Sequence, residues 1–322
     1  MGRPIRIEYP GALYHITSRG NEKKKIFLQD ADRIKFLKIL EDYHDRYGIL
    51  IHGYILMDNH YHLILETPRG NLLKVMHGIN SNYTGYFNRK YGRSGHLFQG
   101  RYKGILVERD SYLLSLSRYV HLNSVRAGLV ERPEDYRWSS YRGYIGREKE
   151  LGWVEYGWVL SQLGSEKRRA QRRYRGYTEE GLEEKEGVPF QSLYHQVILG
   201  GEEFIGKIKG MLKGRRLPQG VVGRKRLVDS PSPMEVVGVV SEVFGVNREE
   251  ILDRGSYRHL ARKVAIYLCQ RYTGLSYEAI GKLFGGIHYS TVSKVTERIR
   301  EEMLRDKKLS ELMNRVTSHF KA

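Results

Sequence analysis

The chain has 322 residues, with 55 lysines and arginines against 37 aspartates and glutamates, and its formal net charge is +18. Because this positive excess is spread along the chain, it favours a polyanionic partner, most simply a nucleic acid; the alternative is a basic protein whose charge serves only solubility. No run of 18 apolar residues is present, so we expect no transmembrane helix, and the first residues lack the apolar segment of a signal peptide. The single cysteine excludes a disulfide within the chain. We therefore expect a cytoplasmic protein.

The first 145 residues predict an α+β domain. Residues 12–18 and the pair 49–57 and 60–66 have the composition of strands, and the pair is expected to form an antiparallel hairpin around residues 57–59. Residues 95–108 are expected to form a further strand region with a basic middle, in which Arg101 and Lys103 are candidate DNA contacts.

Three helices are expected between and after these strands, at residues 30–47, 71–91 and 110–123. In the first, Ile34, Leu37, Leu40 and either Tyr43 or Tyr47 have the spacing of a packed face. The third begins at Asp110, a residue type that caps helices well. The order β-α-β-β-α-β-α predicts a split βαβ (ferredoxin-like) fold, with helices on one face of an antiparallel sheet.

The remainder of the chain divides at about residue 232. Residues 146–232 are interpreted as a basic helical or linker region, with a charge run at 166–187 and a Gly-, Pro- and Arg-rich stretch at 214–233 that is a candidate for phosphate contacts. Residues 233–322 are predicted to be wholly helical. Helices are expected at 233–246, 258–274, 276–286, which Ser276 caps, and 288–304. Their short glycine-containing turn is typical of a helix-turn-helix, and Cys269 is expected to be a core residue.

His60 and His62 occupy alternate positions of the strand at 60–66, so their side chains point to the same face of the sheet. Two imidazoles in this arrangement can hold one metal ion. The alternative is that they are ordinary polar residues on a solvated face, and an isolated His-x-His pair would favour that alternative. Five further histidines, which are His15, His52, His77, His96 and His121, are not expected to take part directly in catalysis.

Two residues of the helix at 110–123 favour the metal interpretation. Tyr119 and Asn123 are four residues apart and share one helix face, beside the packed stripe of that helix. A divalent ion held by two imidazoles and an amide oxygen would polarise a phosphodiester that the tyrosine hydroxyl attacks. Such a mixed ligand set suits Mg²⁺ or Mn²⁺ better than zinc. Tyr112 is the rival nucleophile, but it lies in the first turn and has no amide partner one turn later.

The sequence segments "YHITSRGN", "HYHLILE", "GRSGHLFQGRYKGILVE" and "RYVHLNSVRAGLVERPEDYRWSSYRGY" resemble those of the REP-associated tyrosine transposases, relatives of the IS200/IS605 transposases among the single-tyrosine HUH enzymes. This resemblance covers about residues 1–145. It implies that His60 and His62 are metal ligands, Tyr119 the nucleophile and Asn123 the third ligand. It also implies cleavage and joining of single-stranded DNA beside short hairpins through a 5′-phosphotyrosine. Two departures from the family pattern are Ser124, where proline is common, and Tyr61 at the middle of the histidine motif.

Residues 233–305 resemble the DNA-binding domain at the C-terminus of the replication initiator DnaA, in "RHLARKVAIYLCQRYTG", "SYEAIGKLFGG" and "STVSKV". The resemblance implies that the helix from about residue 289 enters the major groove of duplex DNA. The candidate contacts are Arg254, Arg258, His288, Tyr289, Ser290, Thr291 and Lys294. The family's usual Asp-His is replaced here by His288-Tyr289, so the target sequence of DnaA is not assumed. The alternative for this region is a helical bundle used for protein contacts.

The sequence therefore predicts a site-specific transposase for single-stranded DNA with an added duplex-binding module, acting as a monomer or a homodimer. One alternative is a non-catalytic DNA-binding regulator derived from a transposase, and another is a relaxase or replication initiator with the same chemistry. A third alternative is an RNA-processing enzyme, which charge and aromatic content do not exclude.

Overall fold

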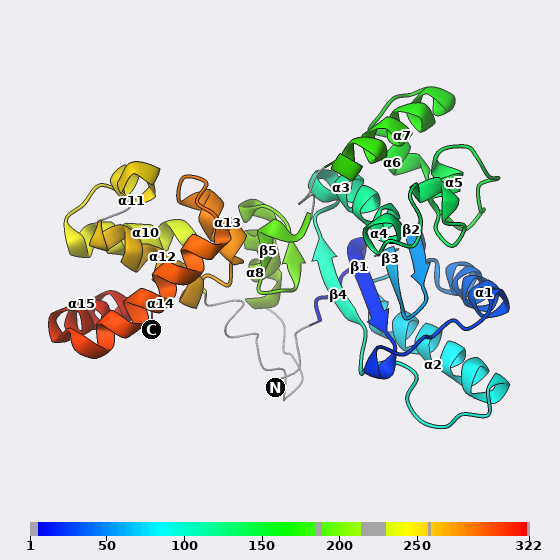
Figure 1. The fold of residues 1–322 in the computed structure, drawn as a ribbon, viewed down its shortest axis with the longest axis horizontal. Helices are drawn as coiled ribbons and strands as arrows, with labels where there is room; N and C mark the ends of the chain where they lie inside the picture. The colour runs from blue at the N-terminus through cyan, green and yellow to red at the C-terminus, as the bar shows by residue number, and fades with distance from the viewer. Residues whose placement is uncertain (1–5, 184–188, 214–229, 257–258, 321–322) are drawn as a thin grey trace. The chain divides into compact units, whose positions relative to one another are not determined.

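The computed structural model describes residues 6–183, 189–213, 230–256 and 259–320. Contacts divide the chain into two units, which we call the sheet unit, residues 6–189, and the helical unit, residues 190–322 (Figure 1). The predicted domain limits at 145 and 232 stay predictions. Most of the Gly-, Pro- and Arg-rich stretch at 214–233 lies outside the described residues. Among the described helices, none combines the length and the hydropathy that crossing a bilayer requires.

The sheet unit contains the antiparallel sheet that the sequence predicts. Its strands are β1 (Ala12–Arg19), β2 (Leu50–Met57), β3 (His60–Thr67) and β4 (Lys103–Val107). They are ordered β2-β3-β1-β4, and each neighbouring pair is antiparallel (Figure 1). The α+β fold class is thereby confirmed. The last strand is shorter than residues 95–108, because Gly95 and Gly100 adopt positive φ angles of 84° and 70° that interrupt an extended chain.

Helices cover both faces of this sheet, whereas we expected them on one face. The helices concerned are α1 (Asp30–Tyr47), α2 (Leu72–Lys90) and α3 (Arg109–His121). Tyr61 of β3 packs on Phe36 of α1 and donates a 2.6 Å hydrogen bond to Asn80 of α2. His62, the next residue, faces α3 on the other side of the sheet. Burial along β3 agrees with helices on both faces of the sheet, because all residues of this strand after His60 are buried.

Two details of the helices differ from the sequence prediction. The buried face of α1 consists of Phe36, Ile39, Leu40 and Tyr43, whereas Ile34 is 55% exposed, so the packed face is rotated from the predicted one. The helix α3 begins at Arg109 after Glu108, so Asp110 lies inside its first turn and does not cap it.

The charge run at 166–187 forms a helix in its described part. The segments that follow α3 are α4 (Asn123–Arg126), α5 (Tyr141–Tyr144), α6 (Gly157–Ser161) and α7 (Lys167–Glu183). The helix α7 carries charges on its outer face but buries Ala170, Tyr174 and Thr178 against the unit. It packs beside α3 and therefore supports the helix that carries Tyr119.

The helical unit begins with a short hairpin that the sequence analysis did not predict. The elements of the helical unit are β5 (Leu193–Tyr194), β6 (Ile198–Leu199), α8 (Glu202–Lys213), α10 (Pro233–Phe244), α11 (Arg248–Leu252), α12 (Leu260–Tyr272), α13 (Tyr277–Leu283), α14 (Tyr289–Arg305) and α15 (Lys307–Ser318). The predicted cap of α13 is confirmed, since the Ser276 side chain accepts a hydrogen bond from the backbone N–H of Ala279. Cys269 is fully buried in the core of this unit, as expected.

The turn between α13 and α14 is fixed by a buried arginine and a glycine. Arg262 is 2% exposed and donates hydrogen bonds of 2.8 and 2.7 Å to the carbonyl oxygens of Ile251 and Phe284. At Gly281, an added Cβ would overlap the backbone carbonyl oxygen of Ile287. Because backbone atoms cannot move aside cheaply, the spacing of the two helices depends on this glycine.

We predict that Gly281→Ala destabilises the helical unit by about 2 kcal/mol or more, since the overlap must be relieved by separating α13 from the turn. The matched control is Gly210→Ala in α8, where a Cβ meets nothing within 4 Å, so a gain of about 0.5–1 kcal/mol is expected. All three tryptophans lie in the sheet unit, so the relevant transition is the one seen by circular dichroism but not by tryptophan fluorescence. Equal unfolding midpoints for the two variants would contradict this account.

Candidate active site and DNA-binding surfaces

His60 and His62 lie on the face of β3 that is turned towards α3, with ring centroids 5.1 Å apart. Their Nδ1 atoms already have partners. The Nδ1 of His60 lies 2.7 Å from the Oδ1 of Asn59, and the Nδ1 of His62 lies 2.9 Å from the Nε2 of His15. The Nε2 atom of each ring is therefore the one suited to hold an ion, with the partner at Nδ1 fixing the ring orientation.

Burial keeps both imidazoles uncharged near neutral pH. Burial, helped by the charge of Arg19, lowers the pKa of His60 to about 4. Burial, followed by the neighbouring rings of His15 and His60, lowers the pKa of His62 well below its ordinary value. A neutral imidazole is the form that coordinates a metal ion, so the site does not have to release a proton before binding one.

Tyr119 of α3 lies against these histidines. Its ring centroid is 6.1 Å from that of His62 and 6.0 Å from that of His15, and both contacts are edge-on. The Cζ atom of Arg126 lies 5.3 Å from the centroid of the Tyr119 ring. Burial raises the pKa of the Tyr119 phenol, and the positive charge of Arg126 opposes this rise. Tyr112, the rival nucleophile, makes no ring contact with these histidines among the described residues.

Asn123 is tied to the same helix turn as Tyr119. Its amide nitrogen donates hydrogen bonds of 2.8 and 3.4 Å to the carbonyl oxygens of Tyr119 and Val120. With the nitrogen used in this way, the amide oxygen is the atom that is suited to a hard divalent ion. The described residues contain no group of three or more His, Cys, Asp or Glu side chains placed to hold a metal ion. A metal in this unit would therefore depend on the two imidazoles together with an oxygen of another residue type, which is the set that His60, His62 and Asn123 would provide.

The sequence analysis missed the position of His15. This residue is 4% exposed and stacks on His62 with an interplanar angle of 15° and a centroid distance of 5.1 Å. The signal was present in the strand order, because β1 pairs with β3 and Thr17 lies opposite His62. Side chains two residues apart share a face, so His15 had to point the same way as Thr17. Without the pairing register, the sequence could not identify this neighbour.

His121 is a buried residue that anchors α3. It is fully buried, its Nδ1 lies 2.7 Å from the hydroxyl of Tyr174, and its Nε2 lies 2.8 Å from the hydroxyl of Ser140. The Tyr174 hydroxyl also donates a 3.0 Å hydrogen bond to Ser117. These hydrogen bonds connect α3 to α7 and to Ser140, the N-cap residue of α5. They therefore fix the position of α3, which carries Tyr119, relative to the sheet.

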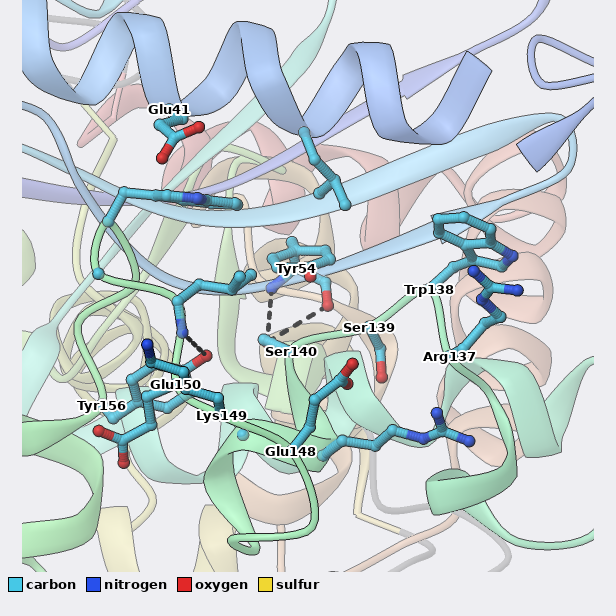
Figure 2. A pocket seen from close by; sticks show the side chains of 16 residues that line it. Glu41, Tyr54, Arg137, Trp138, Ser139, Ser140, Glu148, Lys149, Glu150 and Tyr156 are labelled. Atoms are coloured by element: carbon cyan, nitrogen blue, oxygen red, sulfur yellow. Dashed lines mark hydrogen bonds between the residues drawn. The ribbon is translucent and has the colours of Figure 1, made fainter. Parts of the chain in front are cut away.

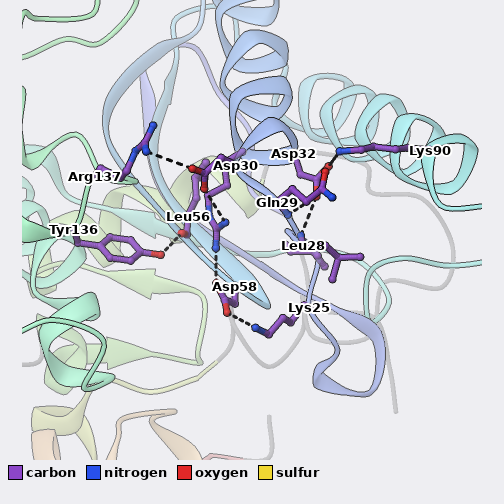
Figure 3. Close-up of polar contacts among 12 residues, drawn as sticks. Lys25, Leu28, Gln29, Asp30, Asp32, Leu56, Asp58, Lys90, Tyr136 and Arg137 are labelled. Carbon is purple, nitrogen blue, oxygen red and sulfur yellow. Dashed lines mark hydrogen bonds and ion pairs between the residues drawn. The ribbon is translucent and has the colours of Figure 1, made fainter.

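Ion pairs hold the turn between β2 and β3, from which His60 emerges (Figure 3). Asp58 of this turn pairs with Arg33 of α1 and, at 2.8 Å, with Lys25. Its backbone oxygen accepts hydrogen bonds from the N–H groups of Ile26 and Phe27. The start of β3 is thus fixed from two directions, and the orientation of His60 depends on it.

A cavity of about 720 Å³ lies elsewhere in the sheet unit (Figure 2). It is lined by Tyr54, Trp153 and Tyr156 together with charged side chains of both signs, among them Glu41, Glu148, Lys149 and Arg137. Ser140 bonds the backbone of Tyr54 beneath it, so part of its lining belongs to the framework (Figure 2). None of the site residues predicted from the sequence lines it.

The candidate DNA contacts of the helical unit gather at the start of α14. His288 is the N-cap of this helix, and its ring lies 4.2 Å from that of the 44% exposed Tyr289. Thr291 and Lys294 are also exposed on the first turns, and Ser290 is half-buried. Arg254 is exposed and lies against Gly285 in the helix-turn-helix turn. Arg258 lies outside the described residues, and Arg101 and Lys103 are exposed at the start of β4.

Comparison with known proteins finds a family similar to the sheet unit. The family described as "Transposase IS200 like" matches residues 9–123, the segment that contains the four strands, both histidines, Tyr119 and Asn123. Residues 9–123 are an IS200-like transposase domain. Among solved structures, the chain is similar to the REP-associated tyrosine transposase bound to a REP hairpin. That alignment has 16% identity and a TM-score of 0.40, and it covers 49% of this chain and 91% of that one.

The helical unit matches a second family, described as "Bacterial dnaA protein helix-turn-helix", over residues 233–299. The chain is 32% identical over 92 residues to the chromosomal replication initiator protein DnaA of Corynebacterium jeikeium, covering 28% of this chain and 16% of that protein. It is also 32% identical over 112 residues to DnaA of a Synechococcus strain, covering 31% of this chain and 24% of that protein. The chain thus spans a quarter or less of these relatives, and it joins a transposase domain to a DnaA-like DNA-binding domain.

We predict that Tyr174→Phe destabilises the transposase domain by about 1–3 kcal/mol, because it leaves buried His121 and Ser117 without their shared hydroxyl partner. The control is Tyr112→Phe, which removes the same atom from a half-buried ring on α3 and should change stability by less than about 0.5 kcal/mol. Urea unfolding followed by tryptophan fluorescence measures both. Equal midpoints would show that the network does not hold α3.

Proposed function

We propose that the transposase domain cleaves and rejoins single-stranded DNA next to hairpin-forming repeats, with Tyr119 as the nucleophile. The observation that carries this proposal is the contact of the Tyr119 ring with His62, at 6.1 Å between centroids, on the face of β3 that His60 and His62 share. A nucleophile beside a pair of neutral imidazoles is the arrangement needed for covalent attack on a metal-polarised phosphate. The match to IS200-like transposases over residues 9–123 supports the same assignment.

In the proposed reaction, the Oη atom of Tyr119 forms a bond to the scissile phosphorus while the bond from phosphorus to the 3′ oxygen breaks. The phenol loses its proton, the departing strand leaves with a 3′-hydroxyl, and the other strand stays attached through a 5′-phosphotyrosine. A 3′-hydroxyl then attacks that phosphorus and releases the phenol, which rejoins DNA without an external energy source. A phenol of pKa about 10 is a better leaving group than a sugar hydroxyl, so the second step is feasible.

The residues present fit a divalent metal ion, which we propose to be Mg²⁺ or Mn²⁺. His60 and His62 would hold it through Nε2 and Asn123 through its amide oxygen, with water completing the shell. When bound, the ion would supply Lewis-acid polarisation of the phosphate and charge stabilisation. His15 orients the ring of His62 by holding its Nδ1, and Asn59 does the same for His60. Arg126 lies over the Tyr119 ring, where its charge favours the phenolate.

We further propose that the DnaA-like domain binds duplex DNA near the target of the transposase domain. The exposed side chains at the start of α14 would read bases in the major groove. The net charge of +18 supplies the sequence-independent part of the affinity through phosphate contacts.

We predict that incubation with Mg²⁺ or Mn²⁺ and single-stranded hairpin oligonucleotides copied from the DNA flanking the gene yields a covalent protein–DNA adduct on a denaturing gel. Tyr119→Phe should abolish the adduct, because it removes the phenol oxygen that would form the bond to phosphorus. Tyr112→Phe is the matched control and should keep the adduct. Removal of the metal with a chelator, or His62→Ala, should lower its yield by at least about 100-fold.

Two results would overturn this assignment. An adduct that persists in Tyr119→Phe and is lost in Tyr112→Phe would move the nucleophile to the first turn of α3. Tight binding of every flanking hairpin without any adduct would favour a non-catalytic DNA-binding regulator. The same oligonucleotides made of RNA separate a DNA enzyme from an RNA-processing one.

We predict that Lys294→Ala weakens binding to duplex DNA from the same region by about fivefold or more and leaves adduct formation on single-stranded hairpins unchanged. Lys307→Ala removes an equal charge from the exposed start of α15 and should change duplex affinity less than about twofold. Fluorescence anisotropy with labelled duplex measures both variants. If the two lose affinity equally, binding is governed by net charge and the contacts assigned to α14 are wrong.

A further inference from the structure

The start of α3 is joined to β3 by an ion pair with a buried carboxylate. Glu66 lies near the end of β3, and its side chain is 8% exposed. Arg109, the first residue of α3, donates hydrogen bonds of 3.1 and 3.3 Å from its Nη1 atom to the Oε2 and Oε1 atoms of Glu66. Glu66 and His62 are four residues apart on one strand, so both side chains point to the face that α3 covers. The strand of the histidines and the helix of Tyr119 are therefore bonded directly to each other.

The same carboxylate is held from β2 by His52. This histidine is 1% exposed, and its Nε2 atom lies 2.9 Å from the Oε2 atom of Glu66. Burial would raise the pKa of the Glu66 carboxyl, but the contacts with His52 and Arg109 outweigh this effect and hold the pKa below its ordinary value. An ionised carboxylate only accepts hydrogen bonds, so the Nε2 atom of His52 carries a proton and donates it. The Nδ1 atom of His52 has no hydrogen-bond partner among the described residues, so the ring directs its hydrogen bond to Glu66.

A register shift in β2 brings His52 to this carboxylate. Counted from Gly53, which lies opposite Ile64, a regular strand would place His52 opposite Leu65, whose side chain points to the face of α1 and α2. Instead Ile51 lies opposite Leu65, and His52 is the extra residue of a β-bulge. Bulges change the direction of single side chains and often lie next to functional sites. The irregularity of β2 thus serves the contact with the ion pair.

The ion pair sets the position of α3 along β3. The two elements run in opposite directions, because Arg109 contacts Glu66 whereas Tyr119, ten residues later, contacts His62. Ten residues of helix rise about 15 Å and four residues of strand about 13 Å, so one placement of the helix satisfies both contacts. Between them, α3 buries apolar side chains against the sheet, and apolar contacts are not directional. The ion pair is therefore a directional contact that opposes a shift of α3 along the strand.

We propose that Glu66 and Arg109 are positioning residues of the active site, which set the place of Tyr119 relative to His60 and His62. This inference rests on the proposed function, because it assigns two further residues to that reaction. In this role neither side chain contacts the DNA or the metal ion, and both act through the placement of α3. A shift of α3 by about 1 Å would move the phenol oxygen out of line with the scissile phosphate, and a misplacement of that size lowers a rate by up to about 100-fold.

Arg109→Met and Lys90→Met form a matched pair of variants. Lys90 of α2 makes a 2.6 Å ion pair with the fully buried Asp32 of α1, in the helix layer on the other face of the sheet (Figure 3). Each change removes one partly exposed cation from a buried carboxylate that keeps another hydrogen-bond donor, so both variants should fold. If Arg109→Met does not fold, Glu66→Gln with Asp32→Asn as its control makes the same comparison with the shape of each buried side chain kept.

The rate of adduct formation is measured at saturating hairpin oligonucleotide and saturating Mg²⁺. It should fall by at least about tenfold in Arg109→Met and by less than about twofold in Lys90→Met. Affinity for the hairpin should be equal in the two variants, because each loses one positive charge. A merely structural role would lower the unfolding midpoint without separating the rate from the affinity.

Two results of this comparison would overturn the proposal. Equal rates in Arg109→Met and Lys90→Met would show that the ion pair of α3 contributes to stability and not to the placement of the nucleophile. A loss of hairpin affinity in Arg109→Met alone, with an unchanged rate at saturation, would show that Arg109 contacts DNA directly.

A fluorine label reads the place of Tyr119 without any reaction. A 3-fluorotyrosine introduced in place of Tyr119 lies beside the rings of His62 and His15, so the position of its fluorine NMR signal depends on its distance from them. The signal should move in Arg109→Met and stay in Lys90→Met, and an unmoved signal in both would refute the positioning role. The absence of an adduct in the unmodified protein would refute the proposed chemistry, whereas the fluorine signal would still decide whether the ion pair places this ring.

Discussion

The alternation of side chains along β3 is the constraint on which the transposase domain depends. Tyr61 points into the core between α1 and α2, whereas His62 points to α3, so one strand serves the core and the site at the same time. A shift of the pairing register by one residue would exchange these faces and bury the histidines in the apolar core. The register is fixed by eight pairs with β1 and by the ion pairs of Asp58 at the preceding turn. The geometry of the site is therefore a consequence of sheet pairing.

The opposite wall of the site is held by polar as well as apolar contacts. The helix α3 buries Leu113, Leu116 and Val120 against the sheet, but its outer side bonds α7 through His121, Ser117 and Tyr174. Apolar side chains can slide with little change in energy, whereas a buried hydrogen-bond network is satisfied in only one arrangement. This difference gives a physical reason for the buried histidine and tyrosine at these positions. Under the proposed function, a fixed α3 keeps Tyr119 at attacking distance from the phosphate.

The sequence was sufficient for the four strands and three main helices of the transposase domain, but not for the β5–β6 hairpin or for the neighbours of the candidate site residues. The approximate positions of those elements followed from periodicity, and the pair His60 and His62 could be placed on one face because a strand has a period of two. The contact of His15 with His62 required the β1–β3 register, which joins residues 47 positions apart. The exposure of Ile34 depended on how α1 rotates against α2, since both flanks of that helix carry apolar residues. The fixed placement of Asp58 required Arg33 and Lys25, which periodicity does not connect to the turn.

Under the proposed function, the two units recognise different forms of DNA. On α14, exposed polar side chains follow the cap His288 at the spacing of one helix face, which suits the regular groove of a duplex. The candidate contacts of the transposase domain, Arg101 and Lys103, lie in and just after an irregular segment rather than along one helix face, which suits a flexible single strand. His288 and Tyr289 stand where DnaA usually has Asp and His, so the groups that would reach the bases differ. The framework of Arg262 and Gly281 does not include these two residues. Under the proposed function, the helical unit keeps the framework that positions α14. The residues that differ from DnaA are those that would determine which duplex sequence it binds.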